Sequence, residues 1–238
     1  MPPRSNRLRN TLVSLASVAV LLPFSAAASG AQSQDPGEIL GRALADFQAG
    51  RLEESVAGFD RFVEVSPETA PYLWQRGIAL YYVGRYDDCR AQFESHLTVN
   101  PADVENSAWH FLCVARLESP QAAREALLPV GTDSREPMTE IYEMFRGDRP
   151  PEELLPAVSI APRARFYAHL YLGLYYEALG REREAYENIL AAADDDYIVG
   201  GYMNTVAKVH LALLQRTRLE PVENSGLAGL PPAASPPY

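Results

Sequence analysis

The chain has 238 residues, of which 47% are hydrophobic and 10% aromatic, with 2 cysteines and a formal net charge of −10. The hydrophobic content excludes a disordered chain, and two cysteines are too few for a disulfide-stapled scaffold. Lys208 is the one lysine of the chain, so a phosphate-binding P-loop, which needs a lysine directly after a glycine, is also excluded.

The first segment has the pattern of a signal peptide. Three arginines without an acidic residue precede an apolar run over residues 12–24, and small residues follow at positions 26 and 28. We expect cleavage before Ser29, with a cut before Ala31 as the second choice. The prediction is a signal peptide over 1–28 and a linker over 29–35.

The same segment predicts where the chain acts. No cysteine follows the apolar run, and adjacent arginines are missing before it, so we expect export by the Sec route without a lipid anchor, to the periplasm or the extracellular space. The alternative is an uncleaved signal anchor that tethers the chain to a membrane. Without residues 1–28 the net charge is −13, which opposes binding to nucleic acid.

The middle of the chain repeats itself with a period of 34 residues. Each unit reads as an apolar-periodic helix, a turn at a Gly-Arg pair, a second helix and a proline that ends it. Two units cover 36–69 and 70–103, and a third covers 166–199. The pairs at this spacing are Gly50 with Gly84, Phe59 with Phe93, and Pro67 with Pro101.

Less regular helices connect and close these units. Residues 104–128 read as a degenerate helix pair, 135–158 as irregular short helices, and 202–216 as a helix that caps the open end of the array. Residues 219–238 are rich in proline and predict a disordered tail. The fold prediction is an all-α array of about 10 or 11 helices over 36–218.

The third unit carries the pattern of a known family. Small residues at Gly173, Ala185 and Ala192, with Tyr176 and Gly180 between them, resemble the tetratricopeptide repeat (TPR) superfamily. That resemblance implies an α-solenoid of helix hairpins, and it places the two small residues Gly173 and Ala185 where antiparallel helices cross closely.

A narrower resemblance rests on the strings 76–85, 100–103 and 166–180 and on the helix around Trp109. In this order they are similar to the NlpI-type TPR lipoproteins of the outer membrane, which implies a dimeric periplasmic adaptor for envelope proteases and peptidoglycan hydrolases. The lipidated cysteine of that family is missing here. Strings 74–77 and 109–113 also resemble uncharacterised TPR-like proteins.

The first helix of the second unit predicts a binding surface. In the TPR alignment its inner face carries an aromatic strip, and such a strip on a concave helical face suits a peptide. Arg76 and Arg85 flank the strip, which favours a partner with an apolar anchor and acidic neighbours. The alternative is that irregular helices or a second subunit cover the strip as core. The candidate partner-binding residues are Trp74, Ile78, Tyr81, Tyr82 and Arg85.

The cysteines allow two readings. Cys89 and Cys113 fall on neighbouring helices, and export favours a disulfide between them if their Cα atoms lie within about 7 Å. Otherwise both are buried packing residues. His110 lies three residues before Cys113, but no spacing typical of a metal site supports it, so no metal or cofactor is predicted.

These features predict a noncatalytic exported scaffold that binds other proteins or peptides. One alternative is an envelope enzyme with an unrecognised site in the irregular segment 119–160, which holds six acidic residues over 136–153 and no histidine. His169 with Glu177 is a conceivable catalytic pair without a supporting motif. The other alternative is a structural homodimer whose groove serves only self-association.

Overall fold

The computed structural model describes residues 35–194 and 201–219. Within these ranges the chain forms eleven α-helices, two short 3-10 helices and no strand, which confirms the all-α prediction. The expected signal peptide, all of the expected linker except Asp35, and the tail beyond 219 lie outside the described residues.

The N-terminal half of the described chain is built from two helix hairpins. Helix α1 (Pro36–Gln48) packs on α2 (Leu52–Val65), and α3 (Trp74–Tyr82) packs on α4 (Tyr86–Leu97). A 3-10 helix, η1 (Pro67–Tyr72), joins the two hairpins. The hairpins therefore alternate short turns within a pair with a longer connection between pairs.

One turn conformation serves three helix hairpins. Gly50, Gly84 and Gly180 have φ values of 72°, 77° and 72° in the turns after α1, α3 and α9. This left-handed region costs a residue with a Cβ about 1 kcal/mol or more, so glycine suits all three positions. The Gly-Arg turns predicted from the 34-residue period thus share a backbone cause.

One long helix and four short ones follow in the middle of the chain. They are α5 (Val104–Leu117), α6 (Pro120–Glu125), α7 (Met138–Arg146), η2 (Pro151–Glu153) and α8 (Leu154–Ala157). Helix α5 is buried along most of its length and packs on α4, α6, α7 and α9. It is the central helix of the described chain.

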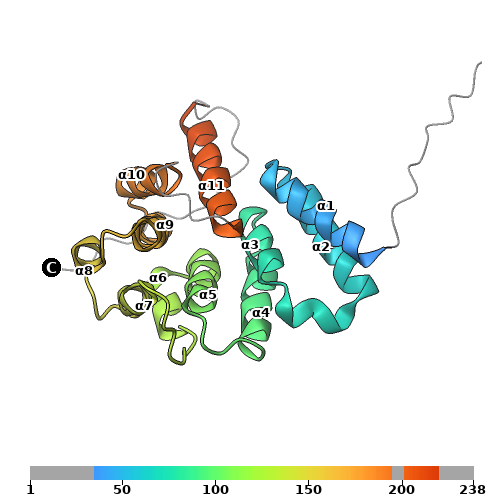
Figure 1. The fold of residues 1–238 in the computed structure, drawn as a ribbon, viewed down its shortest axis with the longest axis horizontal. Helices are drawn as coiled ribbons and strands as arrows, with labels where there is room; N and C mark the ends of the chain where they lie inside the picture. Colours follow the sequence, from blue (N-terminus) through green and yellow to red (C-terminus); the bar gives the residue numbers. More distant parts are fainter. Residues whose placement is uncertain (1–34, 195–200, 220–238) are drawn as a thin grey trace, which may run out of the picture. The chain divides into compact units, whose positions relative to one another are not determined.

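The last three helices close the core. Helix α9 (Pro162–Ala178) packs on α10 (Glu182–Ala192), and α11 (Tyr202–Leu219) packs on α10 and on α1. Proline suits the first position of a helix, and α9 begins at Pro162, four residues before the expected unit. Figure 1 shows α11 lying between the α9–α10 pair and the N-terminal helices.

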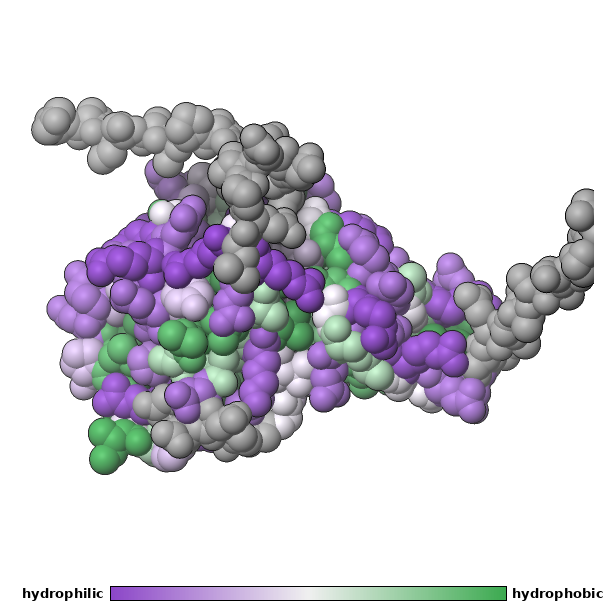
Figure 2. Space-filling view, turned by 90° about the horizontal axis from the view of Figure 1, so that it is seen from above, coloured by the Kyte–Doolittle hydropathy of each residue, from purple (hydrophilic) through white to green (hydrophobic). Residues whose placement is uncertain are grey.

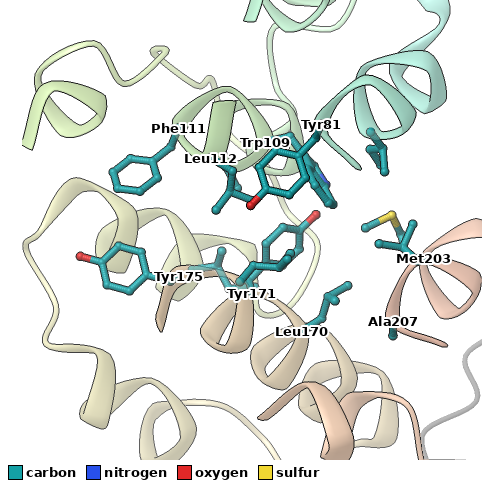
Figure 3. Packing of buried hydrophobic residues seen from close by; sticks show 14 of the residues in the cluster. Tyr81, Trp109, Phe111, Leu112, Leu170, Tyr171, Tyr175, Met203 and Ala207 are labelled. Atoms are coloured by element: carbon teal, nitrogen blue, oxygen red, sulfur yellow. The ribbon is translucent and has the colours of Figure 1, made fainter. Parts of the chain in front are cut away.

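The core joins α3, α5, α9 and α11 through aromatic side chains. Trp109, Phe111 and Tyr171 are fully buried in it, and Figure 3 shows Trp109 on α5 and Met203 on α11 reaching toward one another. Because these residues come from distant parts of the sequence, the core depends on long-range packing as well as on contacts within each hairpin.

Figure 2 shows how polar and hydrophobic side chains are distributed on one face of the chain. On the face drawn in Figure 2, hydrophilic side chains cover most of the surface and hydrophobic ones form small patches between them. Among the described residues, the exposed large hydrophobic side chains are Tyr72, Ile160, Leu179 and Leu190. None of the helices in the described ranges is both long enough and apolar enough to cross a membrane.

Candidate functional site

The predicted aromatic strip divides into two parts. Trp74 and Ile78, at the start and middle of α3, line a cavity of about 360 Å³. Tyr81 and Tyr82, at the end of the same helix, do not line it. Arg85 follows in the turn after α3 and is exposed. Two of the five predicted binding residues therefore share one concave site.

Other helices cover the two tyrosines. The hydroxyl of Tyr82 makes a hydrogen bond of 3.0 Å with Nδ1 of His210 on α11. The hydroxyl of Tyr81 accepts a hydrogen bond of 3.2 Å from Nε of Arg116 on α5. Burial raises the pKa of both phenols far above the ordinary value, so both stay neutral. Helices α5 and α11 therefore cover this end of the strip, and it is not open to a partner.

Both flanking arginines bind a carboxylate of this chain. Arg76 Nη2 lies 2.6 Å from one oxygen of Asp60, and Arg85 Nη1 lies 2.6 Å from the other. Burial raises the pKa of Asp60, but hydrogen bonds from the two guanidinium groups outweigh it and lower the pKa below the ordinary value. The charge that we expected to attract an acidic partner is thus largely used in joining α2 to α3.

The cavity lies where five helices and the loop before α7 meet. Its walls combine aromatic and apolar side chains with an amide, two carboxylates and two guanidinium groups. Helices α3, α4, α5, α9 and α11 all contribute lining side chains. The lining side chains are Trp74, Ile78, Phe93, His96, Asp103, Glu105, Asn106, Trp109, Arg135, Arg163, Tyr167, Tyr202 and Met203.

Both tryptophans of the chain line this cavity. Trp109 is buried on α5 and lies parallel to Phe93, with ring centroids 6.4 Å apart. Trp74 is half-buried and meets Tyr202 of α11 edge to face at 5.2 Å. The aromatic walls are therefore packed against the core on one side and face the cavity on the other.

Three buried polar groups at the cavity have no hydrogen-bond partner within the described chain. They are both carboxamide atoms of Asn106, the indole nitrogen of Trp109 and the hydroxyl of Tyr202. Asn106 is 2% exposed. A buried polar group without a partner costs roughly 1–3 kcal/mol, and a ligand that supplies the missing partner removes that cost.

An acidic cluster forms the wall next to Asn106. Arg135, in the loop before α7, lies within 2.6–2.7 Å of oxygens of Asp103, Glu105 and Asp133. The hydroxyl of Tyr171 donates to the second oxygen of Glu105 at 2.7 Å. One guanidinium group thus balances three carboxylates, which leaves this wall negative.

The two ends of that cluster titrate differently. Burial raises the pKa of Glu105, and hydrogen bonds from Tyr171 and Arg135 only partly oppose the rise. Burial also raises the pKa of Asp133, but hydrogen bonds from the Arg135 side chain and from the backbone N–H groups of Val104 and Arg135 outweigh it and lower the pKa. Asp133 therefore keeps its negative charge to a lower pH than Glu105 does.

Arg163 lines the exposed edge of the cavity and forms no ion pair with a carboxylate of the described chain. The guanidinium carbon of Arg163 lies 5.1 Å from the ring centroid of Tyr167, and the side chain is exposed. Such a cation–π contact contributes about 0.5–1 kcal/mol at an exposed site and leaves the guanidinium N–H groups free to bind an anion.

The two cysteines are joined. Cys89 on α4 and Cys113 on α5 form a disulfide, with Cα atoms 6.0 Å apart and both residues fully buried. His110, one turn earlier on α5, has Nε2 at 3.5 Å from a carboxylate oxygen of Glu94. No group of three or more histidine, cysteine or acidic residues suited to a metal ion occurs within 35–194 and 201–219.

The residues named for catalysis have other partners. His169 Nδ1 pairs with Asn188 at 2.9 Å, whereas Glu177 lies 2.8 Å from Arg116 and 3.0 Å from Nε2 of His210. In the irregular segment, local arginines pair with two of the six acidic residues: Arg149 with Glu143 at 2.7 Å, and Arg146 with Asp148.

Sequence reasoning missed Asn106, Arg163 and Tyr202. A signal existed for Asn106, because it lies three residues before Trp109 and thus on the same helical face. Arg163 and Tyr202 carried no such signal, since they reach the cavity only through the packing of α9 and α11. No protein-family model matches the chain.

Proposed function

We propose that this chain is a noncatalytic, exported helical-repeat scaffold of the TPR type that binds a peptide segment of a partner protein. The observation that carries the proposal is the cavity beside α3, which combines aromatic walls from Trp74 and Trp109 with the buried, unpartnered amide of Asn106. A largely preformed pocket that combines aromatic walls with polar groups suits recognition of one anchoring side chain and the polar groups beside it.

The route of export rests on separate grounds. A disulfide such as Cys89–Cys113 is typical of proteins in oxidising compartments, and the arginine-flanked apolar run over 12–24 is typical of a signal peptide. Intact-mass measurement on envelope and medium fractions tests this. We expect a chain that begins at Ser29, and recovery of the full-length chain in membranes contradicts it.

The binding proposal is tested with a matched pair of variants. Trp74 lines the cavity, whereas Tyr72 is 62% exposed nearby and does not line it. Captured from native envelope fractions, the partner of the wild-type chain should bind Trp74→Ala about thirtyfold more weakly, which corresponds to about 2 kcal/mol. Tyr72→Ala should bind it as the wild-type chain does.

A stability measurement separates this outcome from simple unfolding. Trp74 is half-buried, so its truncation should lower the melting temperature by only a few degrees. Equal loss of binding in both variants, or unchanged binding in Trp74→Ala, contradicts the proposal. A large fall in melting temperature for Trp74→Ala assigns the side chain to the core instead.

A further inference from the structure

Asn106 differs from two nearby polar side chains, Ser107 and Asn100. The hydroxyl of its neighbour Ser107 donates to the carbonyl oxygen of Leu128 at 2.9 Å, and Asn100 donates to Asp103 at 3.0 Å. Asn106 lines the cavity at 2% exposure, yet neither its amide nitrogen nor its amide oxygen has a partner in the described chain. A ligand that enters the cavity therefore finds both carboxamide atoms without a hydrogen-bond partner.

A carboxamide selects the kind of group that binds it. It offers N–H donors and a carbonyl acceptor side by side, which match the N–H and C=O groups of one extended peptide residue, because these two groups point to the same side of the chain. A free carboxylate offers no donor to the Asn106 oxygen, and an ammonium group offers no acceptor to its nitrogen. A neutral ligand with an adjacent donor and acceptor satisfies both atoms.

The volume, the apolar lining and the charge of the cavity limit the size and polarity of the ligand. A volume of about 360 Å³ is near the lower end for ligand pockets and admits one or two amino-acid residues. Trp74, Trp109 and Met203 supply the apolar surface. The negative wall around Arg135 and the net charge of −10 oppose a nucleotide, whose base also carries a donor beside an acceptor.

Two further groups support a main-chain ligand. The indole nitrogen of Trp109 is a donor only, and the hydroxyl of Tyr202 both donates and accepts. Both atoms are buried at the cavity without a partner in the described chain. A peptide group that enters beside an apolar side chain presents a second carbonyl within reach of such donors, because carbonyl groups recur at every residue.

We propose that the cavity binds one apolar residue of a partner peptide together with its main-chain N–H and C=O groups, and that Asn106 pairs with these two groups through both carboxamide atoms. Arg163 at the rim then favours an acidic residue next to the anchor. This inference rests on the proposed function and names the group that the site recognises.

The two tryptophans provide the measurement, because they are the only two in the chain and both line the cavity. We titrate the full chain, with labelled indole nitrogens, with N-acetyl-leucine N-methylamide and with the analogue in which an ester oxygen replaces the leucine N–H. This ester has nearly the same shape but lacks the N–H donor that pairs with the Asn106 oxygen. The amide should shift both indole resonances saturably, and the ester should bind about tenfold more weakly.

Variants assign this preference to Asn106. Asn106→Leu should keep its melting temperature and bind amide and ester equally, whereas Ser107→Ala, one residue along α5, should keep the tenfold preference. Equal affinity of the wild-type chain for amide and ester overturns the inference without any variant. Unchanged preference in Asn106→Leu, or no shift at either indole, overturns it as well.

The same experiment separates this inference from the proposed function. A partner that depends on Trp74 but binds Asn106→Leu with full affinity leaves the scaffold function standing and overturns the role of Asn106. An amide preference that Asn106→Leu abolishes, together with the absence of a captured partner, supports the amide site and counts against the scaffold function.

Discussion

At the scale of single residues, Asn106 and Ser107 form a natural comparison. Both are buried on α5, but only Ser107 has a hydrogen-bond partner, the carbonyl oxygen of Leu128. Ser107→Ala leaves that carbonyl unpaired and should lower the free energy of unfolding by about 1 kcal/mol. Asn106→Leu removes two unpaired polar atoms at similar volume, so the free energy of unfolding should stay equal or rise by about 1 kcal/mol.

Urea unfolding of the three proteins checks this pair. The expected order of stability is Asn106→Leu at or above the wild-type chain, with Ser107→Ala below it. Loss of more than about 1 kcal/mol in Asn106→Leu means that the amide has a structural role and is not reserved for a ligand.

His110 makes stability depend on pH. Burial lowers its pKa from 6.5, and the nearby carboxylate of Glu94 only partly opposes this. Since the folded-state pKa lies below the unfolded one, the stabilisation is complete above pH 6.5 and is lost as the pH falls through the folded-state pKa. Burial lowers the pKa of His169 as well, so two histidines act in the same direction.

The variant His110→Gln tests this contribution. It keeps a side-chain amide near Glu94 but does not titrate, so the fall in unfolding free energy between pH 7 and about pH 5 should be smaller than in the wild-type chain. His169 continues to contribute in the variant. Identical pH dependence of wild type and His110→Gln contradicts the assignment.

The sequence predicted part of the site at this scale. Trp74 and Ile78 were expected on one face of α3 because helical periodicity is a local property, and both line the cavity. The burial of Tyr82 by His210 depends on a residue 128 positions away, which periodicity does not report. The absence of a hydrogen-bond partner for Asn106 is likewise a property of the folded chain that periodicity does not report.

At the scale of helices, glycines separate open positions from close crossings. A Cβ added at Gly173 in α9 would lie 2.8 Å from side-chain carbons of Ile189 and 3.1 Å from its backbone nitrogen. A Cβ added at Gly41 in α1 would meet nothing within 4 Å. Gly173 therefore allows α9 and α10 to pack closely. Gly41 has no such packing role and only lowers the helix propensity of α1.

Alanine substitutions should therefore have opposite effects. Gly173→Ala overpacks the crossing and should lower the free energy of unfolding by about 1–3 kcal/mol. Gly41→Ala should raise it by about 0.5–1 kcal/mol, because alanine is the better helix former in an unobstructed position. Urea midpoints decide, and a stabilised Gly173→Ala would show that the crossing can separate freely.

Helices were more predictable than their packing. The turn glycines and the prolines after the second helices determine the backbone locally. The hairpins could therefore be located from the positions of these residues along the sequence. Helix α11 was expected to cap the end of the array. It also packs on α1 and places Tyr202 parallel to Phe47 at 5.1 Å, a contact between the first and last described helices that local signals do not encode.

At the scale of the whole described chain, a buried polar network links α3, α5, α9 and α11. Glu177 lies between Arg116 and His210, and His210 reaches Tyr82. Burial raises the pKa of Glu177, but His210 and Arg116 outweigh it and lower the pKa, so the carboxylate stays charged near neutral pH. Removing one member of such a network leaves buried charge without compensation, which is costly.

Helix α11 should therefore be required for a stable core. A chain that ends at Asp194 loses the buried side chains of Met203, Val206 and Val209 and exposes the aromatic surface of α3. Each buried apolar side chain contributes roughly 1.5–3 kcal/mol, so their sum is a large part of the 5–15 kcal/mol that stabilises a typical domain. The truncated chain should unfold at a much lower urea concentration, and its tryptophan emission should shift to longer wavelength because Trp74 loses Tyr202.

A chain that ends at Leu219 keeps α11 whole and is the control, with the stability of the full chain expected. Equal urea midpoints for the two truncated chains would mean that α11 only rests on the surface and that the hairpins form the core without it.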